Sequence, residues 1–204
     1  MYYYRGMHFG RLRVIAVAAI MTALLSGCLS TDTTITLDEN GSGSIDLVYT
    51  IDRAAWETGV FDDSDLARPV PVTRHEFDEA VVQIPGLTLR SHRTSETDES
   101  VVVSAQLSFT SLDSLRRFLG ADSLEVDLED GLWRQTLTRG DGSDSPQARA
   151  LAESLAGYQL RFSLAPPQPV TSTSGEVTDG RATFSLPFAE IVTARDAIVW
   201  EVRW

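Results

Sequence analysis

Residues 34–51 read TITLDENGSGSIDLVYTI, and the architecture follows most directly from this stretch. Apolar and polar side chains alternate in residues 34–38 and again in residues 44–51, which is typical of β-strands with one buried face. Between the two runs, Asn40 and Gly41 favour a tight turn because both tolerate the positive φ angles that such turns need. The sequence therefore predicts a β-hairpin here and an antiparallel sheet as the framework of the domain.

The same pattern recurs along the rest of the chain. Two further pairs of alternating runs are each joined by a short polar turn, and helical patterns lie between the pairs. One helix is predicted to begin after Thr73, because Glu76 three residues later completes a capping box. The sequence thus predicts an α+β domain whose largely antiparallel sheet is built from successive β-hairpins, with about three helices packed on one side. The predicted strands are residues 87–94, 100–110, 124–128, 132–138, 158–164, 176–186 and 198–204, and the predicted helices are residues 73–84, 111–119 and 146–156.

The last predicted strand differs from the others because it is apolar on both faces. Trp200, Trp204, Val199 and Val202 leave few polar positions in it. A strand of this kind is expected to be buried or central in a sheet.

The first residues of the chain have the pattern of an export signal. Arg5, Arg11 and Arg13 precede the apolar residues 14–25, with no acidic residue among them. A membrane-spanning helix needs roughly 20 apolar residues, so this stretch is too short for a permanent span. It matches a signal peptide, which is removed from the mature protein.

The apolar stretch ends in Leu25, Ser26, Gly27 and Cys28, which resembles the lipobox of bacterial lipoproteins. Cys28 is the sole cysteine of the chain, so it cannot form an internal disulfide. The pattern predicts cleavage before Cys28 and covalent attachment of diacylglycerol and an N-acyl chain to it, with no other cofactor. The alternative is an ordinary secretory signal with a chance cysteine.

The predicted organisation is a signal peptide at residues 1–27, the lipidated cysteine and a tether at 28–33, and one ectodomain at 34–204. Within the ectodomain we expect an irregular acidic insert at 52–72, with a short helical turn near 53–58.

Residue 29 and the overall charge bear on the location. An aspartate directly after the lipidated cysteine usually retains such proteins at the inner membrane, and here Leu29 follows, so the outer membrane is favoured. The outer leaflet of the cytoplasmic membrane is the alternative.

The formal net charge of the chain is −12, which repels the phosphate backbone of nucleic acids. We therefore expect no nucleic-acid partner.

One acidic motif suggests a metal site. Asp38, Asn40, Ser42 and Asp46 match ligand positions of an EF-hand calcium loop. The twelfth position, however, is Tyr49 where a bidentate glutamate belongs, and the flanking residues are predicted to be strands. The hairpin turn alone explains the motif equally well, so calcium is only a weak candidate.

Other candidate groups are sparse. His75 and His92 are separated and both are expected to face solvent, which leaves little for a zinc site. Alternation predicts that Arg90 and His92 share one face of a strand and that Arg93 lies on the other. No catalytic residues are assigned. The carboxylates of Glu125, Asp127 and Glu129 share one face of a predicted strand, where they could act as acid and base but are better explained as a solvated face.

The lipobox, followed by a strand and the acidic Asn-Gly-Ser-Gly turn over residues 25–52, resembles the opening of LppM-type lipoproteins and of other bacterial envelope lipoproteins. That resemblance implies an α+β ectodomain with a role in lipid or envelope handling. LppM-type proteins usually carry a carboxy-terminal membrane helix, whereas this sequence ends at Trp204, and no functional residue is carried over.

These observations favour a non-enzymatic envelope lipoprotein that binds a partner protein, a lipid or a glycan. The alternative is an anchored hydrolase that acts on envelope polymers through paired carboxylates. An apolar groove between sheet and helices would favour lipid binding, whereas a deep cleft with two carboxylates would favour the enzyme.

Overall fold

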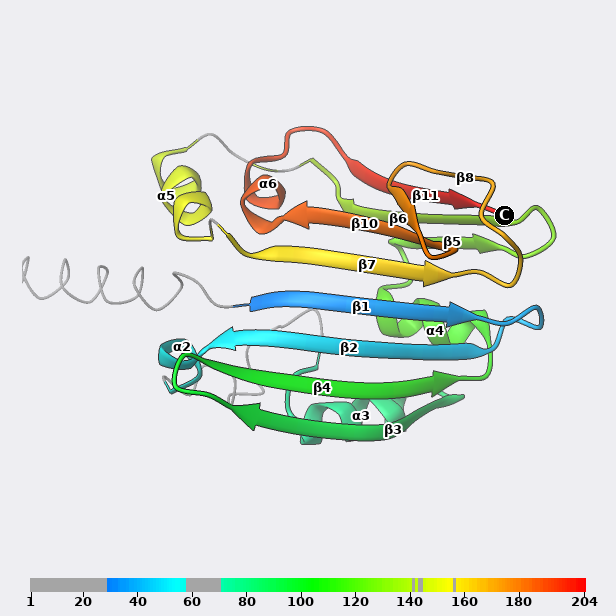
Figure 1. Ribbon diagram of the computed structural model, residues 1–204, viewed down its shortest axis with the longest axis horizontal. Coiled ribbons are helices and arrows are strands. Elements are labelled where there is room, and N and C mark those ends of the chain that lie inside the picture. The colour runs from blue at the N-terminus through cyan, green and yellow to red at the C-terminus, as the bar shows by residue number, and fades with distance from the viewer. Residues whose placement is uncertain (1–28, 58–70, 141, 143–144, 156) are drawn as a thin grey trace, which may run out of the picture.

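The computed structural model describes residues 29–57, 71–140, 142, 145–155 and 157–204. The predicted signal peptide, Cys28 and most of the predicted insert lie outside these ranges. The described residues form a large sheet, a small sheet and five helices (Figure 1). The predicted α+β class is confirmed.

The large sheet has seven strands in the order β3-β4-β2-β1-β7-β10-β9. All neighbours are antiparallel except the central pair β1 and β7, which is parallel. The small sheet has the order β5-β6-β11-β8. In the large sheet the strands are β1 (Leu29–Leu37), β2 (Gly43–Asp52), β3 (Leu87–Glu96), β4 (Ser100–Phe109), β7 (Gln159–Ala165), β9 (Glu176–Thr178) and β10 (Arg181–Pro187). The small sheet comprises β5 (Leu124–Asp127), β6 (Leu132–Thr138), β8 (Ser172–Thr173) and β11 (Ile198–Arg203).

The predicted hairpins are confirmed. β1 and β2 pair from Leu29↔Ile51 to Leu37↔Gly43, and Gly41 has a φ of 80°, which the turn requires. The hairpins β3–β4 and β5–β6 form as the alternation predicts. Local side-chain alternation was therefore sufficient to find these pairs.

Helices cover the sheets and connect the strands. α3 carries the predicted capping box, in which Thr73 and Glu76 each accept a backbone N–H of the other. α4 begins after Ser111 and ends at Gly120, and α2 matches the predicted helical turn. The helices are α2 (Arg53–Glu57), α3 (Arg74–Gln83), α4 (Leu112–Leu119), α5 (Pro146–Ser154) and α6 (Phe188–Thr193).

Two segments differ from the prediction. Residues 29–33, expected to be part of a tether, are the first half of β1, because all of them pair with β2 and, from Thr31 on, they also pair with β7. Their alternation was hidden because the buried side chains are Thr31 and Thr33. The strand predicted at 176–186 is divided into β9 and β10 by Asp179 and Gly180, which both have positive φ and form a tight turn. The short elements β8 and α6 were not predicted.

The small sheet packs against the large one through aromatic side chains. The ring of Trp200 in β11 lies 5.9 Å from Phe162 in β7 and 6.0 Å from Trp133 in β6. β11 is flanked by β6 and β8, so its predicted central position is confirmed. Only one of its faces is buried, however, because Trp200 and Val202 point inward while Glu201 forms an ion pair with Arg134 at 3.5 Å.

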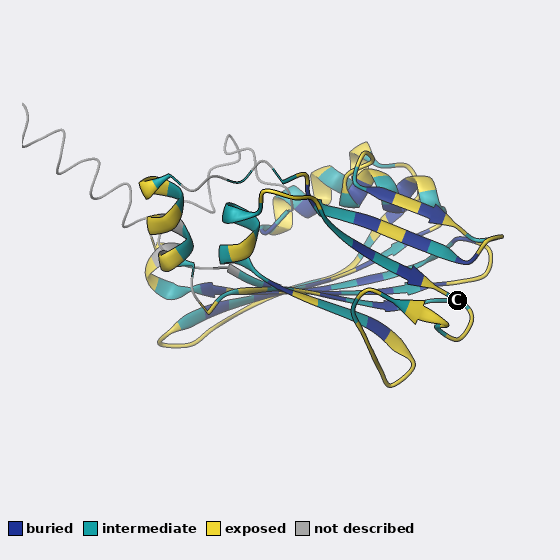
Figure 2. Cartoon of the chain, turned by 90° about the horizontal axis from the view of Figure 1, so that it is seen from above, coloured by how far each residue is buried: buried dark blue, intermediate teal, exposed yellow. Residues whose placement is uncertain are grey.

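The helices α3, α4 and α6 and the small sheet lie on the same face of the large sheet, and we call this its inner face (Figure 2). Its two halves are covered differently. We call the inner face of β2, β3 and β4 beneath α3 the packed half. The inner face of β1 and β7 beneath β6 and α6, together with the ends of β2 and α4 that border it, is the hollow half.

Candidate functional site

The hollow half contains a cavity of about 380 Å³. Its floor is the inner face of β1, β2 and β7, and its opposite wall is formed by β6, α4 and α6. The lining residues are Thr31, Thr33, Leu47, Tyr49, Phe118, Leu119, Ser123, Gln135, Thr136, Leu137, Leu160, Phe162, Phe188 and Ile191. The volume lies within the range of about 300–1,000 Å³ that is common for small-molecule sites.

The local sequence explains why this part of the domain is hollow. Thr31 and Thr33 are short side chains on the floor, where other strands carry Leu, Ile or Val. The covering helix α6 has only six residues, and the pairing of β6 with β11 shifts register between Ile198 and Val199. The short threonine side chains on the large sheet, together with the short helix α6 and the irregular pairing of β6, leave space between the two layers.

The cavity is apolar and uncharged. Eight of its lining residues are Leu, Ile or Phe, and none of the described residues that line it carries a charge. An apolar surface of this kind favours an apolar ligand, because the ligand loses contact with water when it enters.

Three buried oxygen atoms belong to residues of this lining and have no hydrogen-bond partner among the described residues: Thr31 Oγ1, Tyr49 Oη and Gln135 Oε1. The three residues are 5%, 1% and 4% exposed. An unsatisfied buried polar atom costs about 1–3 kcal/mol. Burial, and then the nearby negative charge of Glu76, raises the pKa of Tyr49, so its phenol stays protonated and can donate a hydrogen bond. Each of these oxygens is itself fully buried, so the three residues line the cavity through other atoms.

The cavity lies toward the end of the large sheet where β1 begins, and α6 lies at that end as well (Figure 1). Thr31 is the third residue after Cys28.

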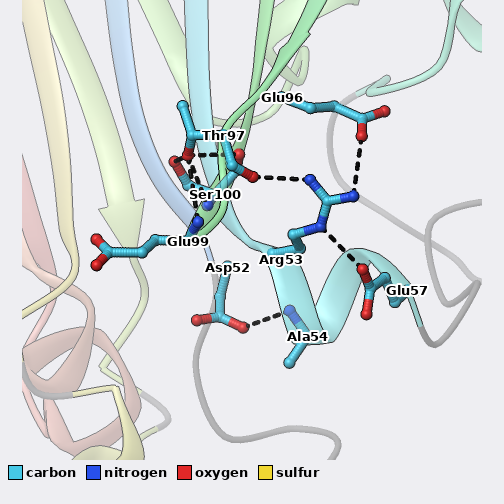
Figure 3. A network of polar contacts seen from close by, with 8 residues as sticks. All are labelled: Asp52, Arg53, Ala54, Glu57, Glu96, Thr97, Glu99 and Ser100. Carbon is cyan, nitrogen blue, oxygen red and sulfur yellow. Dashed lines mark hydrogen bonds and ion pairs between the residues drawn. The ribbon is translucent and has the colours of Figure 1, made fainter.

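A polar network closes the same end of the sheet (Figure 3). Arg53, the first residue of α2, forms ion pairs with Glu57 at 2.8 Å and with Glu96 at 3.2 Å, and donates to the carbonyl of Thr97 at 2.7 Å. The hydrogen bond to Glu57 raises the pKa of Arg53 above its ordinary value. The backbone N–H of Arg53 also donates a hydrogen bond to the carbonyl of Glu99. The ion pair with Glu57 lies within α2, whereas the contacts with Glu96, Thr97 and Glu99 join α2 to the end of β3 and the β3–β4 turn. The network therefore explains how α2 is fixed to this corner of the sheet.

The weak calcium candidate forms the turn between β1 and β2. The Ser42 hydroxyl contacts Asp38 Oδ2 at 2.8 Å and Asn40 Oδ1 at 2.7 Å. Asp46 lies further along β2, where its Oδ1 accepts from the Gln106 side chain at 2.7 Å. The structure thus brings Asp38, Asn40 and Ser42 together but not Asp46. In the part of the chain that is described, no three His, Cys, Asp or Glu side chains cluster in a way that could hold a metal ion.

The two histidines behave differently from each other. His75 is exposed near Glu79, as predicted. The prediction for His92 was wrong, because its Nε2 lies 3.2 Å from the Val72 carbonyl and its ring packs on Phe77. A bulge at Arg90 is the cause: Arg90 is skipped in the pairing of β3 with β4, so His92 turns to the inner face while Arg90 reaches Ser108 on the outer one.

The carboxylates that could suggest acid–base chemistry are on the surface. Glu125 and Asp127 occupy the exposed face of β5, while Leu124 and Val126 on its other face are buried, as the alternation predicted. Asp127 Oδ1 accepts the backbone N–H of Glu129 and so stabilises the turn to β6. None of these carboxylates belongs to the lining of the cavity.

The sequence did not identify the cavity residues. They come from six strands and helices and one loop, so no continuous motif contains them. The one local signal was Tyr49, whose polar hydroxyl shares the buried face of a strand with Ile45, Leu47 and Ile51. A polar tip among buried aliphatic residues needs a partner, and this could have drawn attention to the position.

Within the described ranges, none of the helices is long and apolar enough to cross a membrane. The lipobox residues Leu25 to Cys28 lie outside those ranges. No family model matches the sequence, and no curated protein matches it. The fold is similar to the NMR structure of the folded domain of the Mycobacterium tuberculosis protein LppM, with a TM-score of 0.50 and 13% sequence identity over 88% of this chain and 91% of that chain. This similarity is one of fold, and it covers most of the chain.

Proposed function

We propose that this chain is a bacterial envelope lipoprotein, held on a membrane by lipid attached to Cys28, whose domain binds the apolar part of a lipid without catalysing a reaction. The cavity between β1, β2, β7 and the elements that cover them carries this proposal. It has the size of a ligand site, an apolar lining and only a few polar atoms.

The source of the ligand is the membrane itself, because Thr31 follows Cys28 by three residues and the strand begins at Leu29. A domain attached in this way has no long linker, so its cavity stays near the bilayer surface. The similarity of the fold to the LppM domain agrees with an envelope lipoprotein. The outer membrane is the proposed location, on the strength of Leu29 after the anchor, with the outer leaflet of the cytoplasmic membrane as the alternative.

The proposal can be tested with a neutral apolar dye, N-phenyl-1-naphthylamine, which fluoresces when it leaves water. The domain expressed from residue 29 should enhance its fluorescence with saturation. Leu160 lies on the cavity floor beside Thr31. Leu160→Trp should lower the affinity for the dye at least tenfold, because the larger ring occupies part of the cavity.

Val82→Trp is the matched control, since it adds the same ring to a residue that is 84% exposed on α3. This variant should bind the dye as the wild type does. Absence of saturable binding by the wild type, or equal binding by wild type and Leu160→Trp, would contradict the proposed site.

A further inference from the structure

One wall of the cavity is held less firmly than the others. The floor belongs to the large sheet, and β6 has a strand neighbour on each side, β5 and β11. α4 is fixed by its buried residues Ser114, Leu115 and Phe118. α6, by contrast, has no buried residue, although Phe188 and Ile191 line the cavity. A segment with few buried apolar contacts opens at a low cost in free energy.

Backbone contacts at its two ends attach α6 to the rest of the domain. At the first end, the N–H of Phe188 donates to the carbonyl of Tyr158, just before β7, and the N-cap residue Pro187 adds no side-chain hydrogen bond. At the other end, the N–H of Gly142 donates to the carbonyl of Ala194 at 2.8 Å. α5 packs mainly against α6 and lies beside it in both views (Figure 1, Figure 2), so the two helices can move together.

The contact at the end of α6 needs residues without side chains. A Cβ atom on Gly142 would overlap the carbonyl oxygen of Ala194 and would lie 2.6 Å from its nitrogen. A Cβ atom on Gly140 would lie 2.6 Å from the carbonyl oxygen of Arg195. The two glycines thus let the chain that follows β6 touch the backbone at the end of α6. We call this contact the glycine latch.

The glycine latch closes over the cavity without tying α6 to the core. Its one hydrogen bond, from Gly142 to Ala194, is replaced by hydrogen bonds with water when the latch opens. No buried side chain of α6 has to leave the core in that movement. Opening therefore costs less than moving β6 or α4, which would expose buried residues.

We infer that α6, together with α5, is a lid on the hollow half that closes through the glycine latch and opens to admit a lipid; this inference rests on the lipid-binding function proposed above. The floor, β6 and α4 keep their positions, so the lid alone controls the width of the entrance. Short helices and loops at the edge of a binding site commonly act in this way.

The test uses the full chain in mild detergent and measures how fast a buried thiol reacts with N-ethylmaleimide. Cys28 is the sole cysteine of the sequence, so a cysteine introduced elsewhere can be followed on its own peptide by mass spectrometry. Thr31→Cys places a thiol at a cavity residue that is 5% exposed and pairs with Leu160 near the start of β7. Ala105→Cys places one in the packed half, where Ala105 is 4% exposed. Thr31→Cys should react faster, because the lid opens without unfolding of the domain.

Gly142→Ala, added to Thr31→Cys, tests the latch. The new methyl group pushes the end of α6 away, so the thiol should react roughly tenfold faster, which corresponds to about 1.4 kcal/mol lost by the closed lid.

Gly175→Ala is the matched control, because a Cβ atom there overlaps the carbonyl oxygen of Thr183, and Gly175 does not line the cavity. It should lower the melting temperature but leave the reaction of Thr31→Cys unchanged, since it destabilises the domain equally whether the lid is open or closed.

Hydrogen exchange of the unsubstituted chain gives a second measurement that does not depend on the folding of a variant. Backbone amides of α6 should exchange faster than those of α4 and β6, because the lid opens more often than the other walls. Exchange in α6 that is as slow as in α4 would contradict the lid.

The outcomes separate this inference from the proposed function, because neither measurement contains a ligand. If Thr31→Cys reacts no faster than Ala105→Cys, or if Gly142→Ala and Gly175→Ala change its reaction equally, the lid is wrong and the lipid-binding function stands. If the lid opens as expected but the wild type does not bind N-phenyl-1-naphthylamine, the lipid-binding function fails, and the role of the lid in admitting a lipid fails with it.

Discussion

The packed half and the hollow half of the inner face are built from the same kind of strand but are filled differently. In the packed half, β4 presents Val101, Val103, Ala105 and Leu107, which are at most 4% exposed, beneath the ten-residue helix α3. In the hollow half, β1 presents Thr31 and Thr33 beneath the six-residue helix α6. In the packed half aliphatic side chains lie beneath a long helix, whereas in the hollow half threonines beneath a short helix line a cavity.

If the proposed function holds, the packed half serves stability and the hollow half serves binding. Protein interiors are normally close-packed, and both a void and an unsatisfied polar atom reduce the free energy of unfolding. The hollow half contains both. We interpret this as stability given up for a ligand, while the packed half provides the core that supports the fold.

The largest expected effect comes from adding volume to the packed half. Ala105 lies between Leu47 and His92 in the register of the sheet and is 4% exposed. Ala105→Leu should lower the free energy of unfolding by about 1–3 kcal/mol, because the added carbons find no free space. Urea denaturation measures this value. A loss below about 0.5 kcal/mol would mean that this half is not closely packed.

A smaller effect is expected from adding more volume to the hollow half. Leu160→Trp introduces a larger group than Ala105→Leu does, yet it should change the free energy of unfolding by less than about 1 kcal/mol in either direction, because the ring enters existing space. The same urea series gives the comparison. If Leu160→Trp costs as much as Ala105→Leu, the two halves do not differ in packing.

The sequence predicted the parts of the fold whose information is local. The first hairpin follows from alternation around Asn40 and Gly41, and the start of α3 follows from Thr73 and Glu76. Where a feature depends on pairing between distant segments, the prediction failed. The bulge at Arg90 reverses the face of His92, and β1 extends to Leu29 because its first residues pair with the end of β2.

The cavity could not be predicted for the same reason. Thr31, Tyr49 and Gln135 are far apart in the sequence, and what makes them a site is the distance between two layers, which no local pattern records. Alternation in β2 predicts that Tyr49 points inward but says nothing of what lies opposite. The weak calcium motif shows the converse, because its residues are adjacent in sequence yet Asp46 lies apart from the turn and is bonded to Gln106.

The central claim is that an anchored domain holds a membrane lipid in the hollow half, and mass spectrometry of the full chain purified from bacterial membranes tests it most directly. Under denaturing conditions, the mass should exceed that of residues 28–204 by the lipid on Cys28. Under native conditions, the wild type should carry one additional, non-covalently bound lipid that Leu160→Trp lacks and Val82→Trp retains. A chain with no covalent lipid would contradict the anchor, and a wild type with no bound lipid, or with the same lipid in Leu160→Trp, would contradict the cavity as its binding site.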